Sequence, residues 1–213
     1  MRTMKQLICI AAAFLLGIPG VASASVITYT SSAAFLAALG EATVTTETYE
    51  GLALNSVIAN GDTVNGLTYT GFPRDGGRID NLFNRIGNQS LAVEGSPNFF
   101  LPEEGFSVSF PEAVNAVGIF FNVGLSPVNT LRIVTAAGSA GNGAAYDTAT
   151  LYFVGLIADS PFLTASFERV TGITTGFNVD NLSYAALALE PATLALLGLA
   201  LAGLGFARRR KLH

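Results

Sequence analysis

The sequence predicts one all-β domain, a β-sandwich with a single short helix, between two apolar ends. Three observations predict this class. Apolar and polar residues alternate along the middle of the chain, Asn-Gly and Asp-Gly pairs separate these runs, and the longest apolar stretches lie at the two ends. The length of 213 residues suits one domain with appendages. Half of the residues are hydrophobic, which excludes a disordered chain, and a single Cys excludes an internal disulfide framework.

Residues 1–24 have the features of a secretory signal peptide. Two cations precede an apolar run of about 12 residues, and Ala22 and Ala24 are the small residues that a signal peptidase reads. A transmembrane helix is the alternative, but it needs about 20 apolar residues. We therefore predict that signal peptidase cleaves after Ala24 and that the ectodomain spans residues 25–188.

The first element predicted in the ectodomain is a short helix from Ser31 to Gly40. Ser31 is suited to the N-cap because its hydroxyl accepts a hydrogen bond from a free backbone N–H. Gly40 follows the last apolar residue and is a common helix stop. Nearly everything after this helix has the pattern of strands.

Strand patterns are clearest in the second half of the ectodomain. Phe106, Val108 and Phe110 alternate with serines in a run that is expected to end at Pro111. The glycine-rich stretch from Gly138 to Gly143 is predicted to be a flexible loop at an end of the sandwich. Four turn pairs punctuate the runs, as in a β-sandwich. They are Asn60-Gly61, Asn65-Gly66, Asp75-Gly76 and Asn142-Gly143.

The ectodomain is acidic and lacks most catalytic side chains. Five Arg stand against fourteen Asp and Glu in residues 25–188, a net charge of −9, and no Lys, His, Cys, Met or Trp occurs there. An acidic surface repels phosphate backbones, so we exclude nucleic acid as a partner. Without His or Cys the domain cannot form a Ser-His-Asp triad, a Cys nucleophile or an ordinary zinc site. Only carboxylate chemistry remains. Glu103 and Glu104 are adjacent and would point to opposite faces of a strand, so we expect a solvated turn there and not a catalytic pair.

Asp180 and Asn181 interrupt the alternation of the last strand-like run. Carboxylate and amide oxygens are ligands that calcium prefers, so one interpretation is a calcium site at a sandwich edge. The other is a β-bulge in which both side chains bond to neighbouring backbone. The sequence favours the bulge, and calcium is the one cofactor that it suggests.

Sugar binding would use exposed aromatic side chains beside polar groups. Trp is absent, and among the tyrosines Tyr146 stands out because it lies beside Asp147 close to the glycine-rich loop. These two residues are the ligand-binding candidates. Phe99 and Phe100 are expected to plug the core, the alternative being an exposed platform.

The C-terminal end, residues 189–213, combines an apolar run with a cluster of cations. Residues 191–207 are uncharged, and their number of 17 is at the lower limit of the roughly 17–25 needed for a transmembrane helix. The cations that follow resist export, so they are expected to stop transfer and stay on the cytoplasmic side of the inner membrane. They are Arg208, Arg209, Arg210 and Lys211.

This tail resembles a known sorting signal. The stretch Leu189-Glu190-Pro191-Ala192-Thr193-Leu194, with the apolar run and the cations after it, is similar to the PEP-CTERM signal of Gram-negative bacteria. In that family a Pro-Glu-Pro motif precedes a short transmembrane helix and an Arg-rich end. The resemblance implies that an exosortase, a membrane transpeptidase, removes the tail, with Leu189, Glu190 and Pro191 as the sorting and cleavage motif. Leu189 stands where the first Pro is usual.

The second half of the ectodomain resembles a jelly-roll-like β-sandwich that is often attached to such tails. The resemblance rests on residues 117–121, 153–156, 160–162 and 176–184. It implies a jelly-roll-like arrangement of the strands.

From these observations we predict a non-catalytic secreted protein of the cell surface or extracellular matrix, structural or adhesive in an exopolysaccharide biofilm. The expected partners are signal peptidase, an exosortase-type enzyme, the inner membrane for the precursor, and extracellular polysaccharide. A carbohydrate-binding module is the first alternative. A secreted glycan hydrolase with a carboxylate pair is the second.

Overall fold

The computed structural model describes residues 25–81, 86–95, 99–101, 104–123, 131–142, 151–169 and 176–187. Within these stretches the protein is mostly β with one helix, as predicted. The helix is α2 (Ser32–Leu39). The strands are β1 (Val26–Tyr29), β2 (Thr45–Glu47), β3 (Val57–Ile58), β4 (Thr63–Val64), β5 (Leu67–Thr70), β6 (Gly77–Asp80), β7 (Ser90–Val93), β8 (Gly105–Val123), β9 (Leu131–Thr135), β10 (Gly138–Asn142), β11 (Leu151–Arg169) and β12 (Phe177–Ala185). They join in the main order β10-β9-β11-β8-β12-β7-β6-β3, and β1, β2, β4 and β5 pair beside this path.

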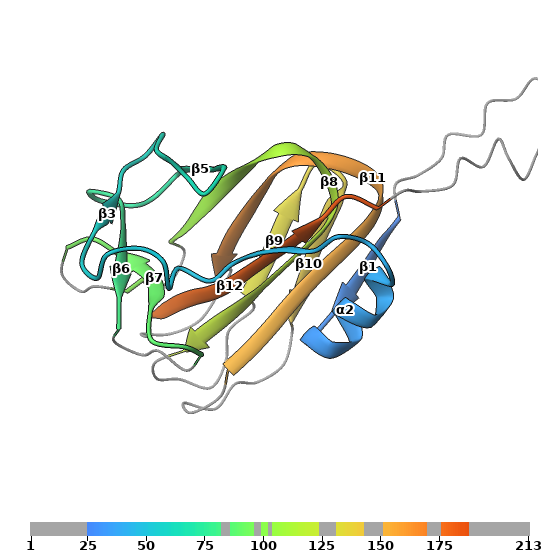
Figure 1. Ribbon diagram of the computed structural model, residues 1–213, viewed down its shortest axis with the longest axis horizontal. Helices are drawn as coiled ribbons and strands as arrows, with labels where there is room; N and C mark the ends of the chain where they lie inside the picture. The colour runs from blue at the N-terminus through green and yellow to red at the C-terminus, as the bar shows by residue number, and fades with distance from the viewer. Residues whose placement is uncertain are drawn as a thin grey trace, which may run out of the picture.

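The two longest strands, β8 and β11, run antiparallel to each other through both halves of the sheet (Figure 1). In the first half, residues 105–109 pair with 164–168, and β5 and β9 extend this half on either side. In the second half, residues 116–122 pair with 151–157, with β12 beyond β8 and β1 beyond β11. The pairing shifts register between these blocks, where both strands arch over.

Pro111 does not end the strand, so that prediction is wrong. β8 continues through it to Val123. Pro has no backbone N–H and is tolerated in a strand only where the ladder needs no donor. Pro111 lies between the two paired blocks of β8, and Pro161 occupies the matching stretch of β11. Neither is a paired residue, so both fit the arch without loss of a ladder bond.

The two halves of the sheet face each other across one hydrophobic core, in the manner of a sandwich. Phe106, from the first half of β8, stacks on Phe100 with ring centroids 5.4 Å apart. Phe100 stacks in turn on Phe177 of β12 at 5.0 Å. All three side chains are buried. Alternate residues of a strand point to opposite faces. The residues of β8 and β11 that lie between the inward-pointing ones are therefore directed away from this core.

Helix α2 covers the outer face of the second half of the sheet. Its N-cap is Ser31 and its C-cap is Gly40, as predicted. Phe35 is fully buried, and its ring centroid lies 5.4 Å from that of Phe153 on β11. The helix therefore seals a second, smaller apolar cluster, which leaves the outer face of the first half as the open one.

The predicted turn at Asn65-Gly66 is confirmed. These two residues join β4 to β5 as a tight hairpin, with φ of 51° and 83°. Positive φ at both central positions is what this class of hairpin needs, and Asn and Gly adopt it at the least cost.

The loop predicted at Gly138 to Gly143 is wrong, because its first five residues form strand β10, paired with β9. A tight turn precedes β10 and is shaped by the hydroxyl of Thr135. That hydroxyl accepts from the backbone N–H of Ala137 at 3.2 Å and donates to the carbonyl of Gly138 at 3.0 Å. Backbone hydrogen bonds to β9 hold this outer strand. Its side chains are small and do not alternate between apolar and polar, which is why the sequence showed no strand pattern there.

None of the helices in the described part of the chain is long and apolar enough to cross a membrane. The run expected to do so, residues 191–207, lies outside that part. The predicted signal peptide, with Ala22 and Ala24, lies outside it as well.

Candidate functional site

The outward residues of three neighbouring strands carry a group of hydroxyl side chains, which we call the hydroxyl face. Phe106 and Val108 of β8 point into the core, so alternation places Ser107 and Ser109 outside. The register of β5, β8 and β11 aligns such positions in two rows across the strands. One row is Thr68, Ser109 and Thr164, and the other is Thr70, Ser107 and Ser166.

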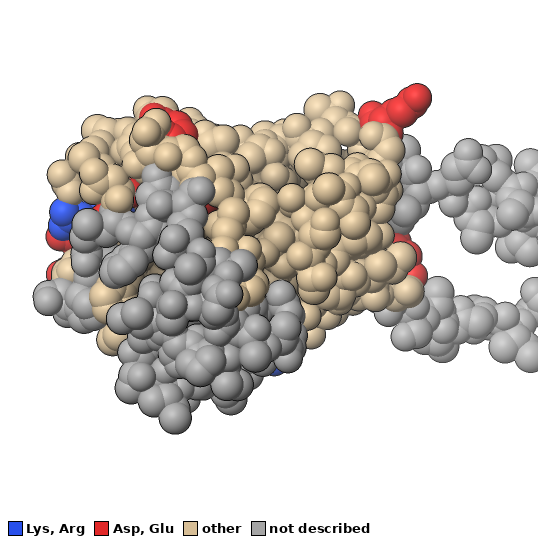
Figure 2. All heavy atoms as spheres, turned by 90° about the horizontal axis from the view of Figure 1, so that it is seen from below, with Lys and Arg blue, Asp and Glu red and all other residues tan. Residues whose placement is uncertain are grey.

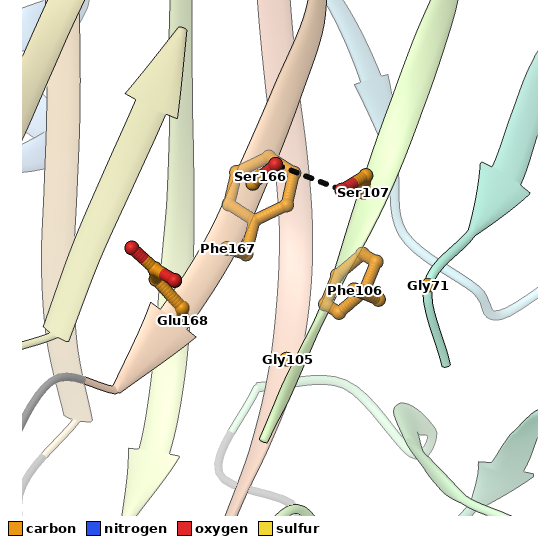
Figure 3. A pocket seen from close by; sticks show the side chains of 7 residues that line it. All are labelled: Gly71, Gly105, Phe106, Ser107, Ser166, Phe167 and Glu168. Atoms are coloured by element: carbon orange, nitrogen blue, oxygen red, sulfur yellow. Dashed lines mark hydrogen bonds between the residues drawn. The ribbon is translucent and has the colours of Figure 1, made fainter. Parts of the chain in front are cut away.

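A groove of about 210 Å³ is hollowed at one end of the hydroxyl face (Figure 3). The Oγ atoms of Ser107 and Ser166 face each other across β8 and β11 at 2.8 Å (Figure 3). The other lining residues are Gly71, Gly105, Phe106, Phe167 and Glu168. Since both phenylalanines belong to the core, the polar side chains of the groove are the two serines and the glutamate.

Two glycines line the groove beside the serine pair. Gly71 has φ of 74°, and a Cβ there would lie 3.7 Å from the Oγ of Ser107. A Cβ on Gly105 would come within 2.2 Å of the backbone oxygen of Phe167, which leaves no room for a side chain. Glycine is therefore required at Gly105 by close approach and favoured at Gly71 by its backbone conformation.

Arg132 of β9 holds the carboxylate of Glu168 at the side of the groove. Oε1 of Glu168 accepts from Nε of Arg132 at 2.9 Å and from Nη2 at 2.5 Å. Within the described stretches no group donates to Oε2. The two side chains are 39% and 36% exposed, so the pair contributes little to stability, and its effect is to fix the direction of an acceptor.

The polar side chains that line this groove are suited to hydrogen bonding. One serine donates to the other, which leaves one O–H donor and free lone pairs on both oxygens. Glu168 adds a charged acceptor. Among the described lining residues Glu168 is the single carboxylate, and the lining contains no His, Lys or Cys.

Away from the groove, the structure places Asp180 and Asn181 at an irregularity of β12. The pairing with β8 shifts between Asp180 and Ser183, and Asn181 has φ of 47°. The backbone N–H of Asn181 donates to Oδ1 of Asp180 at 2.7 Å. These are the features of the bulge that the sequence favoured.

The side chain of Asp180 is fully buried, and Oδ2 has no hydrogen-bond partner within the described part of the chain. Burial raises the pKa of Asp180 from 3.8 to about 7, the N–H of Asn181 opposes the rise, and the carboxylates of Glu50 and Glu47 add to it. No group of three or more His, Cys, Asp or Glu side chains that could hold a metal ion occurs among the described residues.

A scan against known protein families matches residues 190–211, described as a PEP-CTERM protein-sorting motif. The chain carries a PEP-CTERM sorting signal. The predicted resemblance to a PEP-CTERM signal is thereby confirmed: Glu190 and Pro191 stand at the start of the matched residues, and the cations Arg208 to Lys211 stand at their end. Leu189 immediately precedes them.

Two solved structures of carbohydrate-binding modules of family 29 are similar to this chain. One, a CBM29-2 mutant in complex with mannohexaose, has 13% identity and a TM-score of 0.38, and the match covers 71% of this chain and 99% of that one. The other has 12% identity and a TM-score of 0.37, with 72% and 98% covered. These scores are too low to support an argument about fold or ligand, so the sandwich arrangement rests on the register and the core contacts. No curated protein matches the sequence.

The other residues singled out from the sequence are spread over the chain. Tyr146 and Asp147, the ligand-binding candidates, lie outside the described residues, as does Glu103. Glu104 is paired with Arg74 at 3.0 Å and accepts from the backbone N–H of Leu101 at 2.6 Å. Phe100 is a core plug, as expected.

The groove residues were not predicted from the sequence to form a site. The signal was present as two alternating runs, Phe-Ser-Val-Ser-Phe in β8 and Thr-Ala-Ser-Phe-Glu in β11. Ser and Thr are ordinary on the solvent side of a strand, so each run alone indicates only an exposed face. The register between β8 and β11, which aligns Ser107 with Ser166, is what brings them together.

Proposed function

We propose that this protein is exported and held in the inner membrane by its C-terminal tail. An exosortase-type transpeptidase then cuts it, and it serves as a non-catalytic structural or adhesive component of the cell surface or extracellular matrix. The PEP-CTERM motif at residues 190–211 is the observation that carries the proposal. In this scheme residues 1–24 are a signal peptide, 25–188 a jelly-roll-like ectodomain, and 189–213 the sorting tail.

The tail supports a specific order of events. Arg208 to Lys211 stop export, because cations are retained on the cytoplasmic side. The apolar residues 191–207 then hold the protein as a short transmembrane helix. Glu190 and Pro191 come directly before this helix, so the cleavage motif is presented near the outer face of the membrane. The nucleophile for cleavage belongs to the processing enzyme.

The composition of the ectodomain supports a non-catalytic role. Residues 25–188 contain no His, Cys or Lys, which removes the common nucleophile–base pairs. Glycoside hydrolysis needs two carboxyl groups on either side of one bond, whereas the described lining of the groove supplies one. Charged side chains also reach the described surface only in small, separate patches in the view of Figure 2. Such a surface is suited to contact with uncharged material.

A carbohydrate-binding module is the second candidate, and the hydroxyl face favours it. Rows of Ser and Thr with a fixed carboxylate at one end offer the donors and acceptors that sugar hydroxyls use. This candidate differs from the first in requiring a defined sugar site and not only presence in the matrix.

Intact-mass measurement of the protein recovered from the cell surface tests the proposal. We expect a mass that begins at residue 25 and ends near Leu189 to Pro191. A matched variant in which Arg208, Arg209 and Arg210 are replaced by Asn should lose retention in the membrane and escape processing. A surface protein that still contains Arg208 to Lys211 would show that the tail is a permanent anchor, which contradicts the proposal.

A further inference from the structure

We propose that the groove between Ser107, Ser166 and Glu168 binds a neutral glycan through its hydroxyl groups. The inference rests on the proposed function, because it names the class of ligand for the proposed contact with extracellular polysaccharide. Four properties of the groove lead to it: its size, its hydrogen-bonding groups, its charge and its position on the sheet.

The size suits one sugar unit of a longer chain. The groove of about 210 Å³ is smaller than the roughly 300–1,000 Å³ of pockets that enclose drug-sized ligands. It also opens at the side of Gly71, where no side chain stands and the nearest atoms to a Cβ would be 3.7 Å away. A chain can therefore enter and leave the groove along the sheet.

The polar groups of the groove are complementary to sugar hydroxyls. The serine pair presents one O–H donor and several lone pairs at a fixed O–O distance of 2.8 Å. Glu168 offers Oε2, and Arg132 holds its other oxygen, so this acceptor is oriented before a ligand arrives. Hydrogen bonds to a charged acceptor are about twice as strong as neutral ones. A sugar hydroxyl can donate to Oε2 while its neighbour accepts from a serine.

The charge of the site favours a neutral polymer over an anionic one. Arg132, a cation beside the groove, is already paired with Glu168. Outside that pair the lining is uncharged, and residues 25–188 carry a net charge of −9. An anionic polysaccharide would meet this field without a free cation in the described lining, so repulsion disfavours it.

The position on the sheet extends the site beyond the groove. Thr70 continues the row of Ser107 and Ser166, and the second row, of Thr68, Ser109 and Thr164, lies beside it. Successive sugar units of a chain lying over the groove would meet further hydroxyls and no charged side chain in these two rows. Binding is therefore expected to increase with chain length.

Affinity electrophoresis of the full-length protein in native detergent gels tests the inference. The gels contain hydroxyethylcellulose, galactomannan or dextran as neutral probes, or alginate as the anionic probe. We expect at least one neutral polysaccharide to retard the protein and alginate to retard it less. Ser107→Ala/Ser166→Ala should weaken the retarding interaction about tenfold or more, and Glu168→Gln about tenfold, since each removes hydrogen bonds to the ligand.

Two matched controls separate binding from folding. Thr46 and Ser183 form an equivalent cross-strand hydroxyl pair at 2.9 Å away from the groove. Thr46→Val/Ser183→Ala should leave retardation unchanged. Glu104→Gln, which breaks the ion pair with Arg74, is the control for Glu168→Gln. All variants should melt within a few degrees of the parent protein.

Three results would overturn the inference: no retardation by any neutral probe, stronger retardation by alginate, or equal loss in the Thr46/Ser183 control. The assay uses the uncut chain and no exosortase. Its failure would therefore leave the mass result on sorting intact, and a failure of sorting would not affect glycan binding.

Discussion

Replacement of the buried carboxyl of Asp180 by an amide should stabilise the protein relative to the parent at pH 8. This difference in stability should be smaller at pH 4. Asp180→Asn keeps the shape of the side chain. It also keeps an oxygen that can accept the hydrogen bond from the backbone N–H of Asn181, which is 2.7 Å long in the parent. It removes the ability to ionise. The parent side chain is fully buried, and Oδ2 has no partner in the described part of the chain, so the ionised form is costly.

The magnitude follows from the pKa of Asp180, which burial raises from 3.8 to about 7. Between about pH 4 and pH 7 the folded protein holds a proton that the unfolded chain has released, so stability of the parent falls as pH rises through this window. A pKa difference of about 3, at about 1.36 kcal/mol per pKa unit, corresponds to an upper limit of about 4 kcal/mol. The variant cannot ionise at this position, so the difference in unfolding free energy between the two proteins should widen from about pH 4 to about pH 7.

Thermal and urea unfolding of the parent and of Asp180→Asn at pH 4 to 9 measures this gap. Each kcal/mol should appear as a difference of about 2–4 °C in Tm for a domain of this size. Asp75→Asn, at an exposed position, is the control and should show no comparable divergence. A parent whose stability relative to Asp180→Asn does not fall between pH 4 and 8 would refute the reasoning.

Three further changes test other parts of the structure. Phe100→Ala should lose about 3–5 kcal/mol of unfolding free energy, because it empties a fully buried position stacked on three rings, whereas Leu163→Ala at an exposed position should change little. Gly105→Ala should lower Tm by several degrees, because the new Cβ would lie 2.2 Å from a backbone oxygen. Gly51→Ala, where a Cβ would have no neighbour within 4 Å, should not lower Tm. Equal effects of the two substitutions would contradict the close approach at Gly105. Millimolar calcium should leave Tm unchanged, since no group of three or more side chains that could hold a metal ion occurs among the described residues around Asp180. A rise in Tm would instead support the calcium interpretation.

Local chemistry made some elements of the fold predictable. Ser31 and Gly40 bound the helix because capping depends on one or two residues, and Asn65-Gly66 forms a hairpin because positive φ selects those residue types. The alternation around Phe106 likewise predicted which residues of β8 point into the core. Each of these features depends on residues that are neighbours in the sequence.

The errors came from features that depend on distant parts of the chain. Pro111 is tolerated because β8 and β11 arch together at that point, and the partner stretch around Pro161 is 50 residues away. Strand β10 exists because β9 offers it a ladder, although its own side chains are small. The groove has the same origin, since Ser107 and Ser166 meet only when the register of two long strands is known.

The place of β12 in the sheet has a mechanical consequence for any load applied through the C-terminal tail. β12 is the last strand of the described chain, yet it lies inside the sheet, with β8 on one side and β2 and β7 on the other. Its last residue, Ala185, is five residues from Glu190, where the sorting motif begins. A force applied to the tail therefore acts along β12. The hydrogen bonds from β12 to β8 and β2 are perpendicular to this force, so they bear it together. The same order makes folding late, because β8 cannot be completed on this side until β12 has been exported.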